Sequence, residues 1–126
     1  MPVATDERVA SRVKDLQVSV YTVPTDLPEA DGTIHWQSTT MVLVEVSSDS
    51  GHRGLGYSYA SPAAATLVRG LLREVVLGRD VEDIRGTWLA MVDAVRNVGR
   101  PGIAAMAISA IDTALWDLKA RIHEQP

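Results

Sequence analysis

The order of patterns along the chain predicts an α+β fold in which a three-stranded antiparallel meander precedes three helices. Up to Tyr59 the apolar and polar residues alternate, as they do in half-buried strands. From Ser61 onward the apolar residues recur at steps of three and four, which is the period of one helix face. A short connection between the second and third strands favours an antiparallel arrangement.

Length and composition indicate a single globular domain. A chain of 126 residues, with 46% hydrophobic and 22% charged residues, can form one core without a large second unit. The net charge is −4 and the arginines are scattered, so the sequence shows no basic patch of the kind that binds nucleic acid. The lack of cysteine excludes disulfides and thiolate metal sites. No apolar run or leader pattern indicates a membrane span or a signal peptide, so we expect a soluble, cytoplasmic protein.

The first strand is expected after a polar segment, residues 1–13, that shows no clear period and is predicted to be flexible. Leu16, Val18 and Val20 then alternate with polar residues, which is the pattern of a half-buried strand. Pro24 is expected to end this strand because proline has no N–H to donate to a sheet.

The next segment, residues 25–35 (TDLPEADGTIH), is predicted to be a solvated loop because it combines proline, glycine and three carboxylates. Eleven residues are too many for a tight hairpin turn, and loops of this kind often carry function. Asp26, Glu29 and Asp31 have the chemistry of cation ligands, although flexible carboxylates in one loop are more often simply solvated.

Two further strands follow. Residues 39–46 are rich in β-branched residues and give the strongest strand pattern in the chain. Residues 49–51 turn the chain, and residues 54–59 form a short third strand that contains two glycines. Tyr57 and Tyr59 are expected to project from one face of that strand.

Three helices complete the predicted fold. Ser61 followed by Pro62 is a hydroxyl cap with proline in the first turn, and Gly78 ends the helix that starts there. A second helix opens near Asp80 with a capping-box pattern. The third helix, residues 102–122, follows a break at the sequence NVGRPG.

The third helix is apolar on all sides in its first half, where Ser109 is the only polar side chain. A helix of that kind must be covered all round, and a small sheet with two other helices can cover only part of it. We therefore expect Ile103, Met106 and Ala110 to leave an uncovered apolar strip.

The residues alone give no catalytic or metal-binding constellation. His35, His52 and His123 are isolated, and none has the paired spacing of a zinc motif. The glycines around residue 54 lie in a hairpin turn and a strand, not between a strand and a helix, so they do not indicate a dinucleotide site. We find no nucleophile–base pair and no tuned acid–base pair.

The sequence nevertheless resembles a known family. The segment TTMVLVEVSSDSGHRGLGYSYASP, the tripeptide Gly78-Arg79-Asp80, Trp88 and, above all, RPGIAAMAISAIDTALWDLKARI are similar to the N-terminal part of the enolase superfamily, mandelate racemase/muconate lactonizing enzyme branch. The resemblance runs from about residue 14 to residue 122. At Tyr57 many members carry an acidic residue instead.

The resemblance implies that residues 14–126 form a capping domain whose last helix leads into a (β/α) barrel. In that family three carboxylates on barrel strands hold magnesium, and lysine or histidine bases also lie on barrel strands. This chain has no Lys-x-Lys motif, so no catalytic or metal-binding residue can be assigned, and the chain alone is expected to be inactive. Magnesium is expected only in a full-length parent.

What the family resemblance assigns to the cap is the pair of segments that close over the barrel mouth, where such barrels keep their active sites. Here these are residues 25–35 and 57–62. The candidate substrate-specificity residues are Asp26, Glu29, Asp31, His35, Tyr57, Tyr59 and Ser61.

Two functions follow as hypotheses. The first is the non-catalytic capping domain of a magnesium-dependent isomerase or lyase that abstracts the proton α to a carboxylate, for racemisation, acid-sugar dehydration or cycloisomerisation. The alternative is a stand-alone α+β interaction module that self-associates through its apolar C-terminal helix. The expected partner is the missing barrel domain or another copy of the chain. The copies would form a homo-oligomer that buries the helix or the sheet edge.

Overall fold

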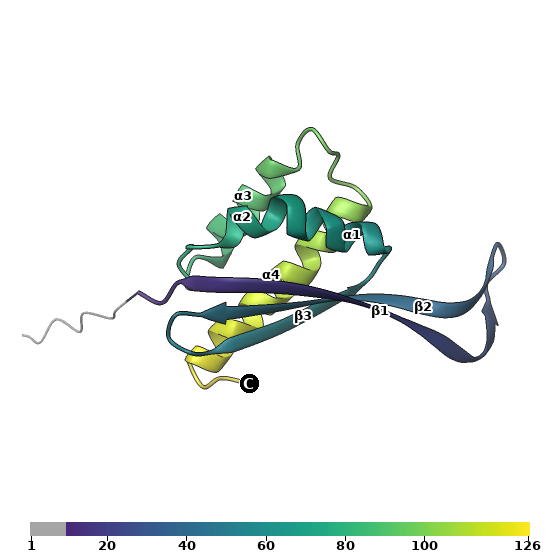
Figure 1. The fold of residues 1–126 in the computed structure, drawn as a ribbon, viewed down its shortest axis with the longest axis horizontal. Coiled ribbons are helices and arrows are strands. Elements are labelled where there is room, and N and C mark those ends of the chain that lie inside the picture. The colour runs from purple at the N-terminus through teal and green to yellow at the C-terminus, as the bar shows by residue number, and fades with distance from the viewer. Residues whose placement is uncertain (1–9) are drawn as a thin grey trace, which may run out of the picture.

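In the computed structural model, which describes residues 10–126, a three-stranded antiparallel sheet is followed by helices, as predicted (Figure 1). The strands have the order β1-β2-β3 and are β1 (Val13–Ala30), β2 (His35–Ser48) and β3 (Arg53–Tyr59). The helical elements are α1 (Pro62–Leu67), a π-helical turn η1 (Val68–Leu72), α2 (Arg73–Val76), α3 (Ile84–Ala94) and α4 (Ile103–Ile122). Residues 1–9, which belong to the segment predicted to be flexible, lie outside the described residues.

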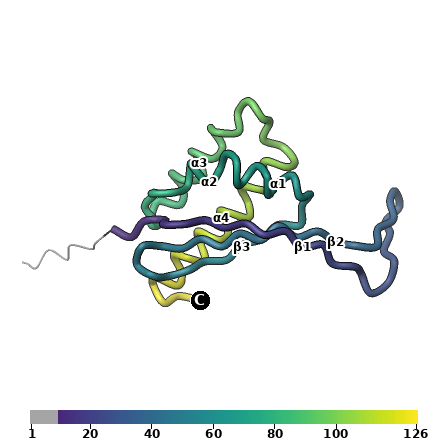
Figure 2. Tube along the Cα trace, viewed as in Figure 1, coloured from purple at the N-terminus to yellow at the C-terminus, as the bar shows by residue number. Residues whose placement is uncertain are grey.

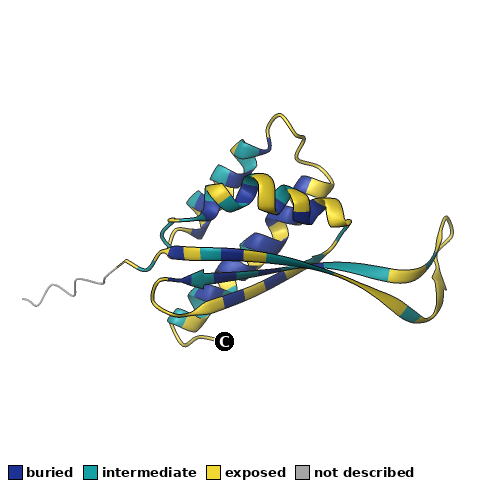
Figure 3. Ribbon diagram, in the orientation of Figure 1, coloured by how far each residue is buried: buried dark blue, intermediate teal, exposed yellow. Residues whose placement is uncertain are grey.

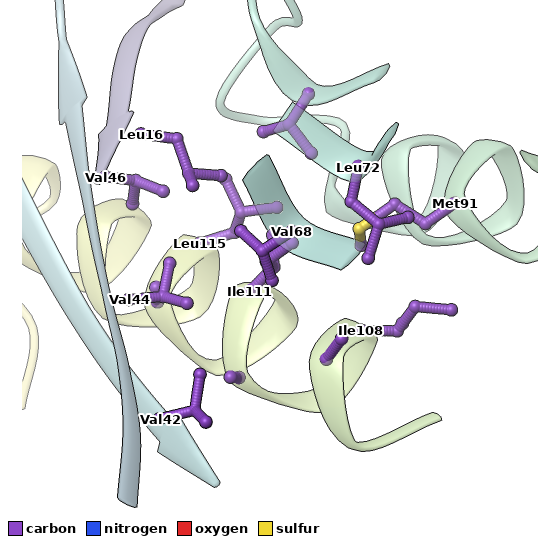
Figure 4. Close-up of a cluster of buried hydrophobic side chains, with 14 of the residues drawn as sticks. Leu16, Val42, Val44, Val46, Val68, Leu72, Met91, Ile108, Ile111 and Leu115 are labelled. Carbon is purple, nitrogen blue, oxygen red and sulfur yellow. The ribbon is translucent and has the colours of Figure 1, made fainter. Parts of the chain in front are cut away.

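The helices pack on one face of the sheet and share a single core with it. Val42, Val44 and Val46 of β2 are fully buried, as their alternation predicts. They meet apolar side chains from α4, η1 and α3 (Figure 4). Along β3, buried and exposed residues alternate (Figure 3), so the opposite face of the sheet is not covered by any helix.

The long helix α4 approaches β3 unusually closely because two strand residues have no side chain. A Cβ atom built at Gly54 would lie 2.2 Å from the Ala114 carbonyl oxygen, and one built at Gly56 would lie 2.2 Å from the Ala110 carbonyl oxygen. Ala110 is consequently fully buried, so the expectation that it would be uncovered is wrong.

The rest of the expected strip on α4 is present. Ile103 is 43% exposed and Met106 is 40% exposed. Further along the helix, Thr113 and Trp116 are also exposed. These four residues follow one another at one, two and one helical turns, and we call them the α4 stripe.

The prediction of a loop at residues 25–35 is wrong, because β1 runs on to Ala30 and β2 begins at His35. Pro24 does not end the strand: β1 is an edge strand, where a missing N–H is tolerated, and Pro24 pairs with Ser38. A register shift between Pro24 and Glu29 accommodates the irregular stretch that follows.

Beyond the last pair of β2 with β3, Met41 with Tyr59, only β1 and β2 continue. This part, residues 22–40, projects from the body of the molecule as a two-stranded hairpin (Figures 1 and 2), and we call it the hairpin arm. In the described part of the chain, no helix has the length and apolar character needed to cross a membrane.

Candidate functional site

The tip of the hairpin arm is a turn held by one carboxylate. Asp31 Oδ1 accepts hydrogen bonds from the Thr33 backbone N–H at 2.6 Å, the Thr33 hydroxyl at 2.7 Å and the Ile34 N–H at 2.9 Å. The backbone N–H groups of Ile34 and Thr33, together with that hydroxyl, hold the pKa of Asp31 below its ordinary value. Asp31 therefore organises the turn and has one oxygen already occupied.

The other candidate residues of the arm lie behind this turn. Glu29 Oε2 accepts a hydrogen bond from Trp36 Nε1 at 3.0 Å, across the hairpin. His35 and Asp26 are exposed and have no hydrogen bond that involves another described side chain. Within residues 10–126, no group of three or more His, Cys, Asp or Glu side chains converges to hold a metal ion, so the arm does not fit magnesium.

The remaining candidates lie at the start of the arm. Tyr57 and Tyr59 project from β3 on the face away from the helices, with their rings 5.8 Å apart and inclined at 74°. Ser61 Oγ accepts a hydrogen bond from the Ala63 N–H at 3.2 Å, which confirms its predicted role as the cap of α1.

The two predicted segments share one end of the sheet, but they do not meet. Tyr59 pairs with Met41, and His35 lies six residues further along β2. At about 3.3 Å per residue this separation is roughly 20 Å. The arm tip and Tyr59 are therefore two separate contact points at the same open end (Figure 1), not the walls of one pocket.

A feature that sequence reasoning missed lies between α3 and α4, beside the α4 stripe. A hollow of about 300 Å³ is lined by Trp88, Val92, Arg100, Ala105, Ile108, Ser109 and Asp112. Burial raises the pKa of the half-buried Asp112 carboxyl. Among the described residues, no hydrogen bond or ion pair is formed by this carboxylate. Only the fold could reveal it, because nothing in the sequence indicates that Arg100 and Asp112, twelve positions apart, line one hollow.

The second carboxylate of α4 has a different, structural role. Asp117 Oδ2 accepts a hydrogen bond from the Leu55 N–H at 2.8 Å and pairs with Arg121 at 3.0 Å. Leu55 belongs to β3, the edge strand, so this carboxylate covers an edge N–H that would otherwise face solvent.

The C-terminal end of α4 is tied to the loop before α3. Glu82 Oε1 lies 2.5 Å from His123 Nε2, and Glu82 Oε2 lies 3.4 Å from Lys119 Nζ. Burial alone would raise the pKa of Glu82, but the contacts with His123 and Lys119 outweigh it and lower the pKa. His123 is an exposed residue at the end of α4, as interpreted from the sequence, and its partner Glu82 is 41 positions away.

Comparison with known proteins gives one family over nearly the whole chain. Residues 11–126 match the family described as mandelate racemase / muconate lactonizing enzyme, N-terminal domain. Among curated proteins, the 3,6-anhydro-alpha-L-galactonate cycloisomerase of Streptomyces coelicolor is 35% identical over 112 residues, covering 85% of this chain and 31% of the relative. The L-talarate/galactarate dehydratase of Salmonella typhimurium is 29% identical over 126 residues, covering 93% of this chain and 32% of the relative.

Solved structures agree with this family. A mandelate racemase/muconate lactonizing enzyme-like protein from Rubrobacter xylanophilus is 52% identical with a TM-score of 0.86, covering 89% of this chain and 31% of that protein. A racemase from Streptomyces coelicolor A3(2) with bound magnesium is 34% identical with a TM-score of 0.83, covering 86% of this chain and 32% of that protein. The chain thus spans about a third of the length of the relatives that it matches.

Proposed function

The chain belongs to the mandelate racemase/muconate lactonizing enzyme branch of the enolase superfamily as its N-terminal capping domain, and from this we propose that it caps the barrel of a magnesium-dependent enzyme acting on a sugar acid. The match over residues 11–126 carries the proposal. The named relatives act on galactonate, talarate or galactarate derivatives, which are all carboxylates. The reaction class is abstraction of the proton α to that carboxylate, followed by dehydration, racemisation or cycloisomerisation.

In this proposal the barrel packs against the α4 stripe. Ile103, Met106 and Trp116 are between 40% and 51% exposed, although large apolar side chains at these positions gain free energy from being covered. The neighbouring hollow with Asp112 offers a carboxylate that a hydrogen-bond donor of the barrel would satisfy. Together these features make one side of α4 suited to a permanent partner.

The hairpin arm and Tyr59 then act as lid elements at the barrel mouth. An isolated two-stranded hairpin is marginally stable in water, and the arm carries Leu27 at 75% and Ile34 at 59% exposure. Seated on a barrel mouth, the arm would gain contacts, exclude water and contact the substrate. Its candidate specificity residues are Asp26, Glu29, Asp31 and His35, and those nearer the sheet are Tyr57, Tyr59 and Ser61.

The chain's own residues contribute binding and positioning, and not the metal chemistry. The described residues do not fit magnesium, because no suitable ligand group converges among residues 10–126. Magnesium ligands and the base are in this proposal supplied by the rest of the parent enzyme. The cap orients the substrate, keeps water out and selects among sugar acids.

A chimera tests this function. Residues 10–126 would replace the matching N-terminal third of the Streptomyces coelicolor cycloisomerase, and cycloisomerase kcat and KM would be measured. We expect a folded chimera that turns over substrate with an altered KM. Deleting residues 26–33 in the chimera should change KM or substrate preference at least tenfold with little change in melting temperature.

Two matched variants of the chimera separate capping from mere folding. Ile103→Lys combined with Trp116→Lys should abolish turnover by preventing the barrel from packing, whereas Arg85→Lys, at an exposed position outside the α4 stripe, should leave turnover unchanged. Turnover that survives the double substitution would contradict the proposed packing on α4. If deletion of residues 26–33 unfolds the chimera, the arm is structural and not a lid.

A second function, a stand-alone module that self-associates through α4, is favoured by the same exposed residues, Ile103 and Met106. It makes a different prediction. In the isolated 126-residue chain, Ile103→Lys with Met106→Lys would then abolish self-association, and the chimera would gain nothing from an intact α4 stripe.

A further inference from the structure

The sheet has a second uncovered apolar surface, on the face away from the helices. From Gln17 to Val23 in β1, and in the parts of β2 and β3 that pair with each other, the odd-numbered residues point to this side, because the even-numbered Val42, Val44 and Val46 point into the core. The strand register places Tyr21, Met41 and Tyr59 in one row across the three strands, with Leu43 and Tyr57 in the next row. We call the following residues the outer-face patch: Tyr21, Val23, Met41, Leu43, Leu55, Tyr57 and Tyr59.

The patch is large for a protein of this size. Tyr59 is 65%, Tyr57 53% and Tyr21 49% exposed, and Val23 and Leu55 are comparably open. With about 150–250 Å² for a whole aromatic side chain and less for an aliphatic one, these fractions amount to roughly 500–600 Å². Contiguous apolar patches of that size are at the upper limit for monomers and mark interaction surfaces.

Side chains cover part of each edge of the sheet body, which favours the face as the docking surface. On the β1 edge, Arg69 donates to the Val18 carbonyl at 3.0 Å and Arg73 donates to the Leu16 carbonyl at 3.2 Å. On the β3 edge, Asp117 occupies the Leu55 N–H. Strand addition at either edge of the sheet body would have to displace these side chains.

We propose that the outer-face patch binds the same patch on a second copy of this chain, with the two sheets packed face to face. Dimers commonly have two-fold symmetry, in which one surface must be complementary to itself. The patch meets this condition because the charged residues beside it, Glu45 opposite Leu55 and Arg53 on the neighbouring strand, pair with each other at 3.2 Å. The paired charges leave this part of the face without net charge.

The area of the outer-face patch is compatible with a second copy of the chain as the partner. A stable dimer buries about 800 Å² on each partner. The roughly 500–600 Å² of the patch comes closer to that value when the polar border of Gln17, Ser19 and Thr39, on the same face, is included. Packing of two twisted sheets through such faces is a common arrangement in proteins. The surface lies in the other layer of the fold from α4, so a second copy bound there leaves the α4 stripe open, although it takes up Tyr57 and Tyr59, which the proposed function places at the barrel mouth.

Analytical ultracentrifugation of the 126-residue chain, between 1 and 200 µM, tests the proposal. We expect a dimer whose dissociation constant rises at least about 100-fold when Tyr57→Lys and Tyr59→Lys are combined, since interface tyrosines are frequent hot spots. The matched control, Ile103→Lys with Met106→Lys on α4, should leave the dimer unchanged. Circular dichroism checks the fold of every variant.

A second pair of substitutions tests the proposal if the lysine variants do not fold. Tyr57→Thr with Tyr59→Thr removes the rings and introduces β-branched side chains, which strands also favour, and we expect about tenfold weaker association. A wild-type chain that is monomeric at 200 µM would overturn the proposal. So would a dimer that survives both tyrosine double variants, or one that the α4 variant dissociates.

Discussion

Replacing Gly56 by alanine should separate α4 from the sheet, because the new methyl group has no space. The added Cβ would lie 2.2 Å from the Ala110 carbonyl oxygen and 2.5 Å from the Ala114 nitrogen. Both are backbone atoms of α4, which cannot rotate away as the end of a flexible side chain can. Ordinary contact needs roughly 3.4 Å or more, so the helix must move by about 1 Å.

This displacement affects the largest helix–sheet contact in the molecule. Overpacking of a well-filled core costs about 1–3 kcal/mol, and the rigid backbone partners here place Gly56→Ala near the upper value. Replacing glycine by alanine also raises the free energy of unfolding by about 0.4–1 kcal/mol, because alanine restricts the conformations of the unfolded chain. We therefore expect a net loss of about 2 kcal/mol in the free energy of unfolding, or roughly 8 °C in melting temperature for a domain of this size.

Urea and thermal unfolding followed by circular dichroism measure this loss. The matched control is Gly70→Ala in η1, where an added Cβ meets nothing within 4 Å. That variant should gain about 0.5–1 kcal/mol, since alanine is the better helix former. A Gly56→Ala protein within 2 °C of wild type would refute the conclusion that the glycines of β3 set the position of α4.

Three further predictions concern Asp112, Asp31 and magnesium. Asp112→Asn should raise the free energy of unfolding at pH 7 by less than about 1 kcal/mol, because burial in the folded chain raises the pKa of this carboxyl and so disfavours its charged form. The gain should vanish below the ordinary carboxyl pKa, where the group is protonated in both the folded and the unfolded chain. Urea titrations at pH 7 and pH 3 measure the difference. Asp31→Ala should speed hydrogen exchange at the Thr33 and Ile34 amides without lowering the melting temperature. Since the pKa of Asp31 is lowered, the wild-type turn should loosen similarly as the pH falls through that lowered pKa. Calorimetry with MgCl₂ should find no micromolar site on the 126-residue chain.

Sequence reasoning succeeds here wherever the physical cause is local. The alternation of Val42, Val44 and Val46 predicts a buried strand face, and the structure confirms it. Ser61 followed by Pro62 predicts a helix start, and the Ser61 hydroxyl caps α1 as expected. Each signal lies within a few residues, so no knowledge of distant contacts is needed.

The hairpin arm could not be predicted in this way. Two prolines, one glycine and three carboxylates have loop composition, and the alternation that marks a half-buried strand is missing because neither side of the arm is buried. What holds the strands is pairing across the hairpin and the turn built on Asp31. Apolar and polar residues alternate in a strand only where one of its faces is buried, so a strand without a buried face cannot be recognised from this pattern.

The partners of the polar residues were equally hidden. Glu82 meets His123 over 41 positions, and Asp117 meets Leu55 over 62. The burial of Ala110 depends on Gly56, which in the sequence only weakens a strand. Such contacts depend on how α4 crosses the sheet, and a pattern within one element does not specify that crossing.

The two uncovered apolar surfaces lie in different layers of the fold. The α4 stripe belongs to the helical layer, whereas the outer-face patch is the free side of the sheet. Because the buried core separates them, a partner on one surface leaves the other open. A barrel on α4 and a second copy on the sheet would therefore compete only for Tyr57 and Tyr59, which belong to the outer-face patch and lie at the end of the sheet assigned to the barrel mouth. Since Val23, at the start of the arm, belongs to the outer-face patch, pairing of two copies would also brace both arms, and dimerisation would then stabilise the lid elements of each copy.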